Sequence, residues 1–247
     1  MANAQSGGAV RFIVGVGWFA AALFVLGPVL AHFGVTTSLT GFALFGLGGL
    51  LALVGTILGA VALLRRQGAA RGEVLRGFVP AVVVLAIFIG LAARGGGHPR
   101  INDITTDLST PPKFVRAPLL PGNAGRDMGY PGIDFARQQQ EGYPDLRSIR
   151  LAMPADQAFT RVQAAARAMP GWVLTREDAS AKAIEGVDSS WLFRFQDDFI
   201  IEVRDEDGHS VVHMRSKSRD GQGDLGVNAK RIQTFLAKVS ENRAGQQ

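Results

Sequence analysis

The stretch "DDFIIEVRDEDGHSVVHMRSKS", residues 197–218, decides the fold of the C-terminal half of this chain. Apolar and polar residues alternate on both sides of the acidic sequence "DEDG" at 205–208. A period of two on each side of such a turn is typical of a β-hairpin, here with a four-residue loop. One face of the hairpin is apolar, so it must be covered by other elements.

Pairing Arg204 with His209 sets the predicted register of this hairpin. The predicted opposite pairs are Ile201 with Val212, Phe199 with Met214 and Asp197 with Ser216 on the apolar face, and Ile200 with His213, Asp198 with Arg215 and Gln196 with Lys217 on the other. The charged pair among them is a predicted cross-strand ion pair.

Helical and strand patterns flank the hairpin. Residues 154–169 show a helical apolar period, and "WVLTRED" at 172–178 and "AKAIEGVDSS" at 181–190 have the pattern of two short strands. A second helix begins at Asp224, whose carboxylate is suited to cap the first turn. The order helix, four strands, helix predicts an α+β domain with a four-stranded antiparallel sheet covered by helices on one face.

The last helix carries a polar residue on its apolar face. The predicted stripe consists of Leu225, Ile232, Phe235, Leu236 and Val239, and it includes Asn228. A buried amide without partners costs about 1–3 kcal/mol, so Asn228 must be hydrogen-bonded. The candidate partners are Asp197, Ser216, Ser218, Arg231 and the backbone of the loop at 221–223.

These residues belong to a polar cluster that allows two interpretations. Its members are Asp197, Arg215, Ser216, Ser218, Arg219, Asp224, Asn228 and Arg231. As a structural network, the cluster joins the hairpin to the last helix. As a ligand site, it offers arginines and a glycine-rich backbone to an anion at a helix N-terminus. Asp224 argues against the ligand site, because its carboxylate occupies the place of the anion.

No catalytic, cofactor-binding or metal-binding residue is predicted. His213 is expected to point away from Ser216, which separates a base from a nucleophile. The chain has no cysteine, and its histidines at 32, 98, 209 and 213 have no metal-ligand spacing. Asp103 and Asp107 have the spacing to help bind a hard cation, but turns in an extended segment explain them more simply.

Three apolar stretches precede this domain, at residues 12–33, 39–64 and 75–93. About 20 apolar residues at ~1.5 Å each cross a hydrocarbon core of ~30 Å. The third stretch gains reach from the side-chain stems of Arg76 and Arg94. We expect three transmembrane helices that act as an anchor. A cleaved signal peptide is the competing interpretation of the first stretch.

The loops predict the orientation of this anchor. The loop at 65–77 contains four arginines and one glutamate, whereas the loop at 34–38 has no charged residue. Because basic loops stay in the cytoplasm, the N-terminus is expected inside and the C-terminal domain outside. The glycines Gly55 and Gly59 have the spacing that lets helices approach closely, either within the anchor or in a homo-oligomer.

The charge distribution argues against nucleic acid as a partner. Residues 1–97 hold six arginines and one acidic residue, and residues 98–247 hold 20 basic and 20 acidic residues. The net charge of +5 therefore belongs to the apolar part, whereas nucleic-acid binding needs a basic face on the folded domain.

The chain divides into four predicted regions. These are a cytoplasmic N-terminus at 1–11, the anchor at 12–93, a Gly/Pro-rich linker and extended segment at 94–150, and an α+β domain at 151–243.

Three blocks of the chain carry a family resemblance. They are "INDITTDLSTPPKF" at 101–114, "RFQDDFIIEV" at 194–203 and "VVHMRSKSRDGQGDLGVNAKRI" at 211–232. Together they resemble domain-of-unknown-function family 1499, found in bacterial and plastid-type proteins, over residues 101–239. The resemblance implies a domain boundary, because many members of the family consist of this domain alone, and the three apolar stretches are then an added anchor. It implies no activity.

We therefore expect a multi-pass protein of the bacterial inner membrane whose periplasmic domain binds an envelope protein or an anionic small ligand. The lipid bilayer is a further expected partner, and no cofactor is expected. The alternatives are a hydrolase or transferase acting on an acidic substrate of the cell envelope, and a structural or assembly partner in the membrane.

Overall fold

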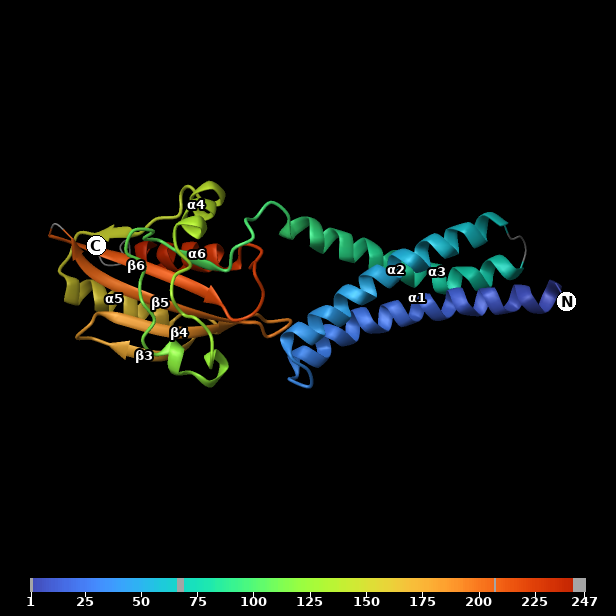
Figure 1. Cartoon of the computed structure of the whole chain (residues 1–247), viewed down its shortest axis with the longest axis horizontal. Coiled ribbons are helices and arrows are strands. Elements are labelled where there is room, and N and C mark those ends of the chain that lie inside the picture. The colour runs from blue at the N-terminus through green and yellow to red at the C-terminus, as the bar shows by residue number, and fades with distance from the viewer. Residues whose placement is uncertain (1, 66–68, 207, 242–247) are drawn as a thin grey trace. The chain divides into compact units, whose positions relative to one another are not determined.

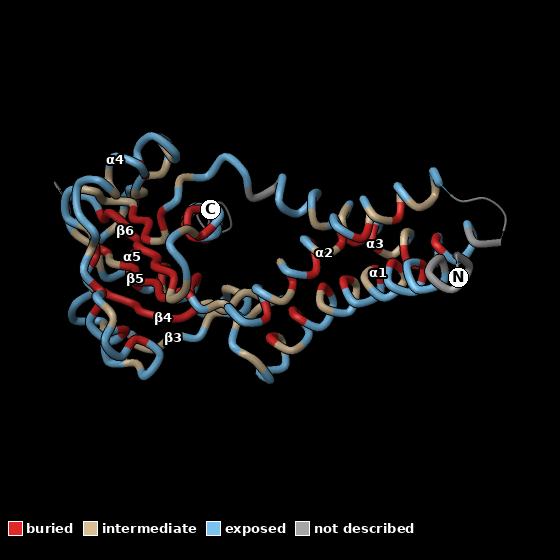
Figure 2. Tube along the Cα trace, turned by 45° about the vertical axis from the view of Figure 1, so that its right-hand side comes forward, coloured by how far each residue is buried: buried red, intermediate tan, exposed pale blue. Residues whose placement is uncertain are grey.

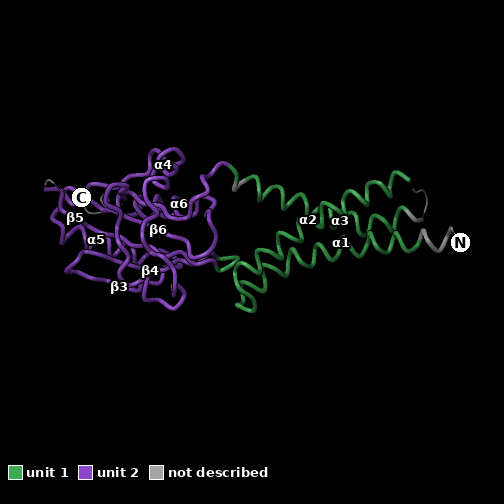
Figure 3. The backbone as a smooth tube through the Cα atoms, in the orientation of Figure 1, with its two compact units in different colours: residues 1–96, 191–194 green, residues 97–190, 195–247 purple. Residues whose placement is uncertain are grey.

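The computed structural model describes residues 2–65, 69–206 and 208–241. The chain forms two compact units, which Figure 3 distinguishes by colour. The first comprises residues 1–96 with 191–194, and the second comprises residues 97–190 with 195–247. Each unit has its own core.

Three helices make up most of the first unit: α1 (Ala2–His32), α2 (Ser38–Arg65) and α3 (Ala69–Gly95). They contain candidate membrane spans at Gly7–His32, Ser38–Arg65 and Arg71–Ala93. The prediction of three helices long and apolar enough to cross a membrane is confirmed.

The glycines of α2 allow the three helices to approach closely. A Cβ atom built on Gly59 meets the Phe78 ring of α3 at 2.5 Å. A Cβ atom on Gly55 lies 3.2 Å from Ala81 of α3 and 3.3 Å from Val16 of α1. Both glycines therefore serve helix packing within one chain.

The second unit contains a six-stranded antiparallel sheet, so the predicted number of four strands is wrong. The strands are β1 (Asp103–Thr105), β2 (Ile149–Leu151), β3 (Val173–Asp178), β4 (Ala183–Ser189), β5 (Gln196–Glu206) and β6 (His209–Ser218). The order is β1-β6-β5-β4-β3, and β2 also pairs with β6. The two additional strands have three residues each, too few to show an alternating pattern in the sequence.

The hairpin of β5 and β6 has a register two residues away from the predicted one. Glu206, not Arg204, pairs near the turn with His209, and Gly208 adopts a left-handed φ of 76°. The strands therefore continue into the acidic stretch, and two residues connect them. Because side chains alternate with a period of two, this shift changes the partners but keeps every residue on its predicted face.

Two helices cover the apolar face of the sheet, α5 (Ala155–Arg167) and α6 (Val227–Glu241). Their core with the sheet includes Phe159, Val162, Ile184, Phe199, Ile201, Met214, Ile232 and Phe235, and Figure 2 shows the buried strands. Leu225, predicted in the helical stripe, lies before α6 with a φ of 52° and is 60% exposed. The prediction for Leu225 is wrong because the helix begins after it.

Residues 106–130 form what we name the covering segment. The segment crosses the sheet on the face opposite to α5 and α6 (Figure 1), where Phe114, Ala117 and Met128 pack on Ile200. It contains two short 3-10 helices, η1 (Ala117–Leu119) and η2 (Pro121–Asn123). The helix α4 (Ile133–Gly142), which the sequence analysis did not predict, follows it.

Candidate functional site

The predicted polar cluster is divided between the two faces of the sheet. On β5 and β6, Asp197, Ser216 and Ser218 lie on the face of α5 and α6, whereas Arg215 lies on the face of the covering segment. Arg219, just after β6, donates to Asp198, which lies on the same face as the covering segment. The cluster is therefore two networks.

The first network joins the sheet to α6. Arg231 donates to Asp197 Oδ2 at 2.6 Å and to Ser216 Oγ at 2.9 Å. The side-chain amide of Asn228 accepts from Ser216 Oγ at 2.7 Å and donates to Ser218 Oγ at 2.9 Å. Asn228 is fully buried, and its predicted partners Ser216, Ser218 and Arg231 are confirmed. Asp197, the remaining side chain predicted to contact Asn228, instead accepts from Arg231.

Asp224 caps α6 as expected. Its carboxylate accepts from the backbone N–H of Asn228 at 2.8 Å and of Gly226 at 3.1 Å. Burial raises the pKa of Asp224, and these two backbone hydrogen bonds oppose the rise. The carboxylate therefore occupies the helix N-terminus, where an anion would otherwise bind.

The second network lies beneath the covering segment. Arg215 donates from Nε and Nη2 to the two oxygens of Asp103, each at 2.8 Å, and Lys217 Nζ lies 2.9 Å from Asp103 Oδ2. The guanidinium also donates to the carbonyl oxygens of Pro112 and Met128. Asp103 is fully buried and Arg215 is 1% exposed. Asp103 is therefore the counter-charge of two buried cations.

The predicted ion pair between Asp198 and Arg215 is wrong. Asp198 instead accepts from Arg219 Nε at 2.9 Å and Nη2 at 2.7 Å, and from Asn123 Nδ2 at 2.9 Å. The two-residue change of register places Lys217 opposite Asp198. Arg215 then pairs with Asp103, a residue of β1 that the four-stranded prediction did not include.

A buried carboxylate also holds the start of η1. Glu185 on β4 is fully buried and accepts from the backbone N–H groups of Val115, Arg116 and Ala117 at 2.9–3.0 Å. Arg176 Nη1 lies 3.3 Å away. The covering segment is thus attached to the sheet by side-chain contacts to its backbone.

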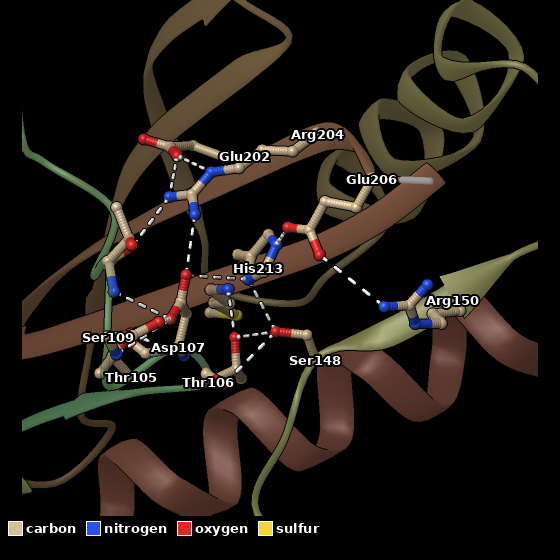
Figure 4. Close-up of polar contacts among 12 residues, drawn as sticks. Thr105, Thr106, Asp107, Ser109, Ser148, Arg150, Glu202, Arg204, Glu206 and His213 are labelled. Carbon is tan, nitrogen blue, oxygen red and sulfur yellow. Dashed lines mark hydrogen bonds and ion pairs between the residues drawn. The ribbon is translucent and has the colours of Figure 1, made fainter. Parts of the chain in front are cut away.

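A cleft at the edge of the sheet contains a hydrogen-bonded chain that sequence reasoning missed. His213 of β6 is 4% exposed; its Nδ1 lies 2.8 Å from Ser148 Oγ and its Nε2 lies 2.7 Å from Glu206 Oε1. Ser148 directly precedes β2, and Glu206 ends β5. Figure 4 shows His213 joined by dashed lines to Glu206 on one side and to Ser148 on the other.

The carboxylate determines which nitrogen of His213 carries the proton in the neutral ring. Glu206 as a carboxylate only accepts, so Nε2 donates to it. Nδ1 is then an acceptor that faces the hydroxyl of Ser148. Asp107 Oδ2 lies 3.7 Å from the same Nδ1. A proton that moves from Ser148 to His213 thus produces an imidazolium with carboxylates beside both nitrogens.

The cleft has a volume of about 570 Å³ and a polar lining. Its wall includes the three arginines Arg147, Arg150 and Arg204 and the hydroxyls of Thr106, Ser109, Thr110 and Ser148. The side chains of Arg147 and Arg150 are 74% and 56% exposed. Exposed ion pairs are weak, so these guanidinium groups are able to exchange their present carboxylates for a ligand.

Asp107 belongs to the covering segment and also lines the cleft. Burial favours the neutral form, but hydrogen bonds from the Ser109 side chain, from backbone N–H groups and from Arg204 outweigh it and lower the pKa of Asp107 from 3.8 to about 2. The contacts include Thr110 N at 2.9 Å and Arg204 Nη1 at 2.8 Å. The turn expected around Asp107 is confirmed, whereas Asp103, for which a turn was also expected, lies in β1 and pairs with Arg215.

The described residues contain no group of three or more His, Asp or Glu side chains arranged to hold a metal ion.

The alternation of β6 indicates the face of His213, but no sequence pattern connects it to Ser148, 65 positions away.

The family model described as "Protein of unknown function (DUF1499)" matches residues 103–239, more than half of the chain. The chain therefore belongs to this family, and three helices able to span a membrane precede the matched region. No curated protein and no solved structure matches the chain.

Proposed function

We propose that this protein is a membrane-anchored binding protein whose C-terminal domain takes up a small anionic ligand in the cleft beside β6. The observation that carries the proposal is the pair of exposed arginines, Arg147 and Arg150, on either side of Ser148 and Ile149 along one wall. Guanidinium groups bind carboxylates and phosphates through paired hydrogen bonds. The hydroxyls of Ser109 and Thr110 add groups that hydrogen-bond to anion oxygens.

The cleft is a better candidate for the ligand site than the cluster of eight polar residues. The polar atoms of Asn228, Ser216 and Arg231 bond to one another inside the domain. A ligand at that position must break these bonds, whereas exchange of the partners of Arg147 and Arg150 costs little. We therefore assign the cluster to stability of the domain.

The expected topology accompanies this function. The basic loop between α2 and α3 favours a cytoplasmic N-terminus and a domain on the opposite side, in the inner membrane of a bacterium. Gly55 and Gly59 contact helices of their own chain, and we assign them to the packing of the anchor. Reporter fusions after Gln67 and after Gly97 test the topology. A reporter that is active only outside the cytoplasm is expected to be active after Gly97 and inactive after Gln67. Activity after Gln67 would contradict the proposed orientation.

Binding is tested by titrating inorganic phosphate into the full chain in nanodiscs of neutral lipid. We expect a saturable heat of binding and an affinity that falls as the salt concentration rises. The double variant Arg147→Met and Arg150→Met is expected to lose at least tenfold in affinity. Lys238→Met, which removes a cation from α6, is the control and keeps wild-type affinity. No saturable heat, or equal affinity in all three proteins, contradicts the proposal.

A further inference from the structure

The chain formed by Ser148, His213 and Glu206 has the arrangement of a nucleophile, a base and an orienting carboxylate. The two distances, 2.8 Å and 2.7 Å, are those of direct hydrogen bonds. Such constellations are recognised by geometry and roles rather than by sequence order. Here Nδ1 faces the serine and Nε2 faces the carboxylate.

We propose that this cleft hydrolyses esters of anionic compounds, with Ser148 as the nucleophile and His213 as the general base. This inference rests on the proposed anion binding, because Arg147 and Arg150 hold the charged part of the substrate. Ser148 is partly exposed at the cleft wall and His213 is buried beneath it. The nucleophile is thus accessible to a substrate, while the base is shielded from water.

The reaction balances without a cofactor. Ser148 Oγ attacks the ester carbonyl carbon as its proton moves to His213 Nδ1. The carbon–oxygen bond to the alcohol then breaks, and the leaving oxygen takes the proton from Nδ1. Water attacks the resulting acyl-serine, its proton moves to Nδ1 and then to Ser148 Oγ, and the acid leaves. The net change is ester plus water to acid plus alcohol.

The surroundings of His213 favour its role as a base. The imidazolium formed in each step has Glu206 at Nε2 and Asp107 at Nδ1 as counter-charges, at 2.7 Å and 3.7 Å. Thr106 fixes Ser148 from the other side, since their hydroxyl oxygens lie 3.0 Å apart. The backbone N–H of Met214 donates to the Thr106 hydroxyl at 2.9 Å, which holds it against β6. Glu206 is a positioning residue.

Covalent labelling of the full chain in nanodiscs tests the inference. The probe is a fluorophosphonate with a carboxylate tail, which marks serines that a neighbouring base activates. Mass spectrometry of digested protein locates the adduct. We expect labelling at Ser148 that is abolished in Ser148→Ala and slowed about 100-fold or more in His213→Gln, the usual size of general-base assistance. Ser180→Ala removes an exposed serine outside the cleft and keeps the wild-type rate.

Glu206→Gln distinguishes a catalytic role from a structural one. The variant keeps a hydrogen-bond acceptor but removes the charge beside the imidazolium, so its labelling is expected to slow and its pH profile to move to lower pH. Absence of an adduct at Ser148, or equal rates in wild type, His213→Gln and Glu206→Gln, overturns the inference. If Ser148→Ala and wild type both bind phosphate and neither is labelled, only the hydrolysis is overturned and the binding function stands.

Discussion

The two faces of the C-terminal sheet are covered in different ways. The face under α5 and α6 is mostly hydrophobic, with Phe199, Ile201 and Met214 fully buried. The opposite face carries charged residues that are equally buried, among them Glu185 and Arg215. It is covered by a segment of irregular structure. Helices cover a sheet through apolar area, whereas the mostly irregular covering segment adds to a small apolar contact carboxylates that bind its backbone and paired charges.

This difference predicts where the domain tolerates change. Apolar burial is distributed over many contacts, so the loss of one contact is partly absorbed. The loss of one member of a buried ion pair is not compensated in this way, because the low dielectric that strengthens the pair also raises the free energy of the ion left alone. We expect a substitution that leaves a buried charge beneath the covering segment without a partner to cost more than the loss of a neutral hydrogen-bonding side chain on the helix face.

The largest effect is expected for Asp103→Ala. This change leaves Arg215 and Lys217 buried without their shared counter-charge, and we predict a loss of about 3–5 kcal/mol in the free energy of unfolding. Hydrogen exchange of β6 amides in the full chain measures it. Asp145→Ala removes a carboxylate that is 93% exposed and is the control. A loss below about 1 kcal/mol for Asp103→Ala would remove the contrast between the faces.

A smaller and more local effect is expected for Glu185→Gln. The amide keeps one acceptor oxygen but cannot serve all three backbone N–H groups at the start of η1. We predict faster hydrogen exchange at residues 115–117 by about 10–100-fold, equivalent to about 1.4–2.7 kcal/mol, and unchanged exchange in α6. Equal changes in both regions would show that the covering segment and α6 open as one unit.

On the helix face, Asn228→Ala is expected to cost about 1–2 kcal/mol. The loss comes from hydroxyls of Ser216 and Ser218 that lose a buried partner. Arg231→Ala leaves Asp197 without its guanidinium and is expected to cost more than Asn228→Ala. Hydrogen exchange of α6 amides measures both. A gain in stability in either variant would favour the ligand-site interpretation of this cluster, since functional residues are often kept at a cost in stability.

The smallest effect is expected from acid titration of the Asp107 turn. Its pKa is lowered from 3.8 to about 2 in the folded protein, so the unfolded chain binds the proton more tightly. The stabilisation is therefore full above pH 4 and is lost as the pH falls from about 4 to about 2. Asp107→Asn is expected to show a smaller drop in stability over this range than the wild type. An identical drop in both proteins would show that Asp107 contributes nothing.

The same contrast explains which parts of the fold could be predicted from the sequence. The three helices able to span a membrane, α5, α6 and the strands β3 to β6 were recognisable from apolar patterns. The face of each hairpin residue was also predicted correctly, despite the change in register. Asn228 was detectable because a polar residue interrupts an apolar stripe.

The contacts beneath the covering segment were not predictable, because the residues that make them follow no periodic pattern in the sequence. The pair of Asp103 and Arg215 depends on β1, which has three residues, and Glu185 looks like an ordinary strand residue until the backbone of η1 meets it. The cleft depends on Ser148 and His213 being brought together by the pairing of β2 with β6. Only the folded chain shows which distant segments meet.

The most direct measurement of ligand binding is hydrogen exchange of the full chain in neutral nanodiscs, with and without inorganic phosphate. We predict slower exchange in the two segments that line the cleft, at residues 106–110 and 146–148, and no change in α6. Absence of protection in the cleft, or protection confined to the N-terminus of α6, would contradict anion binding beside β6 and return the search to the opposite face of the sheet.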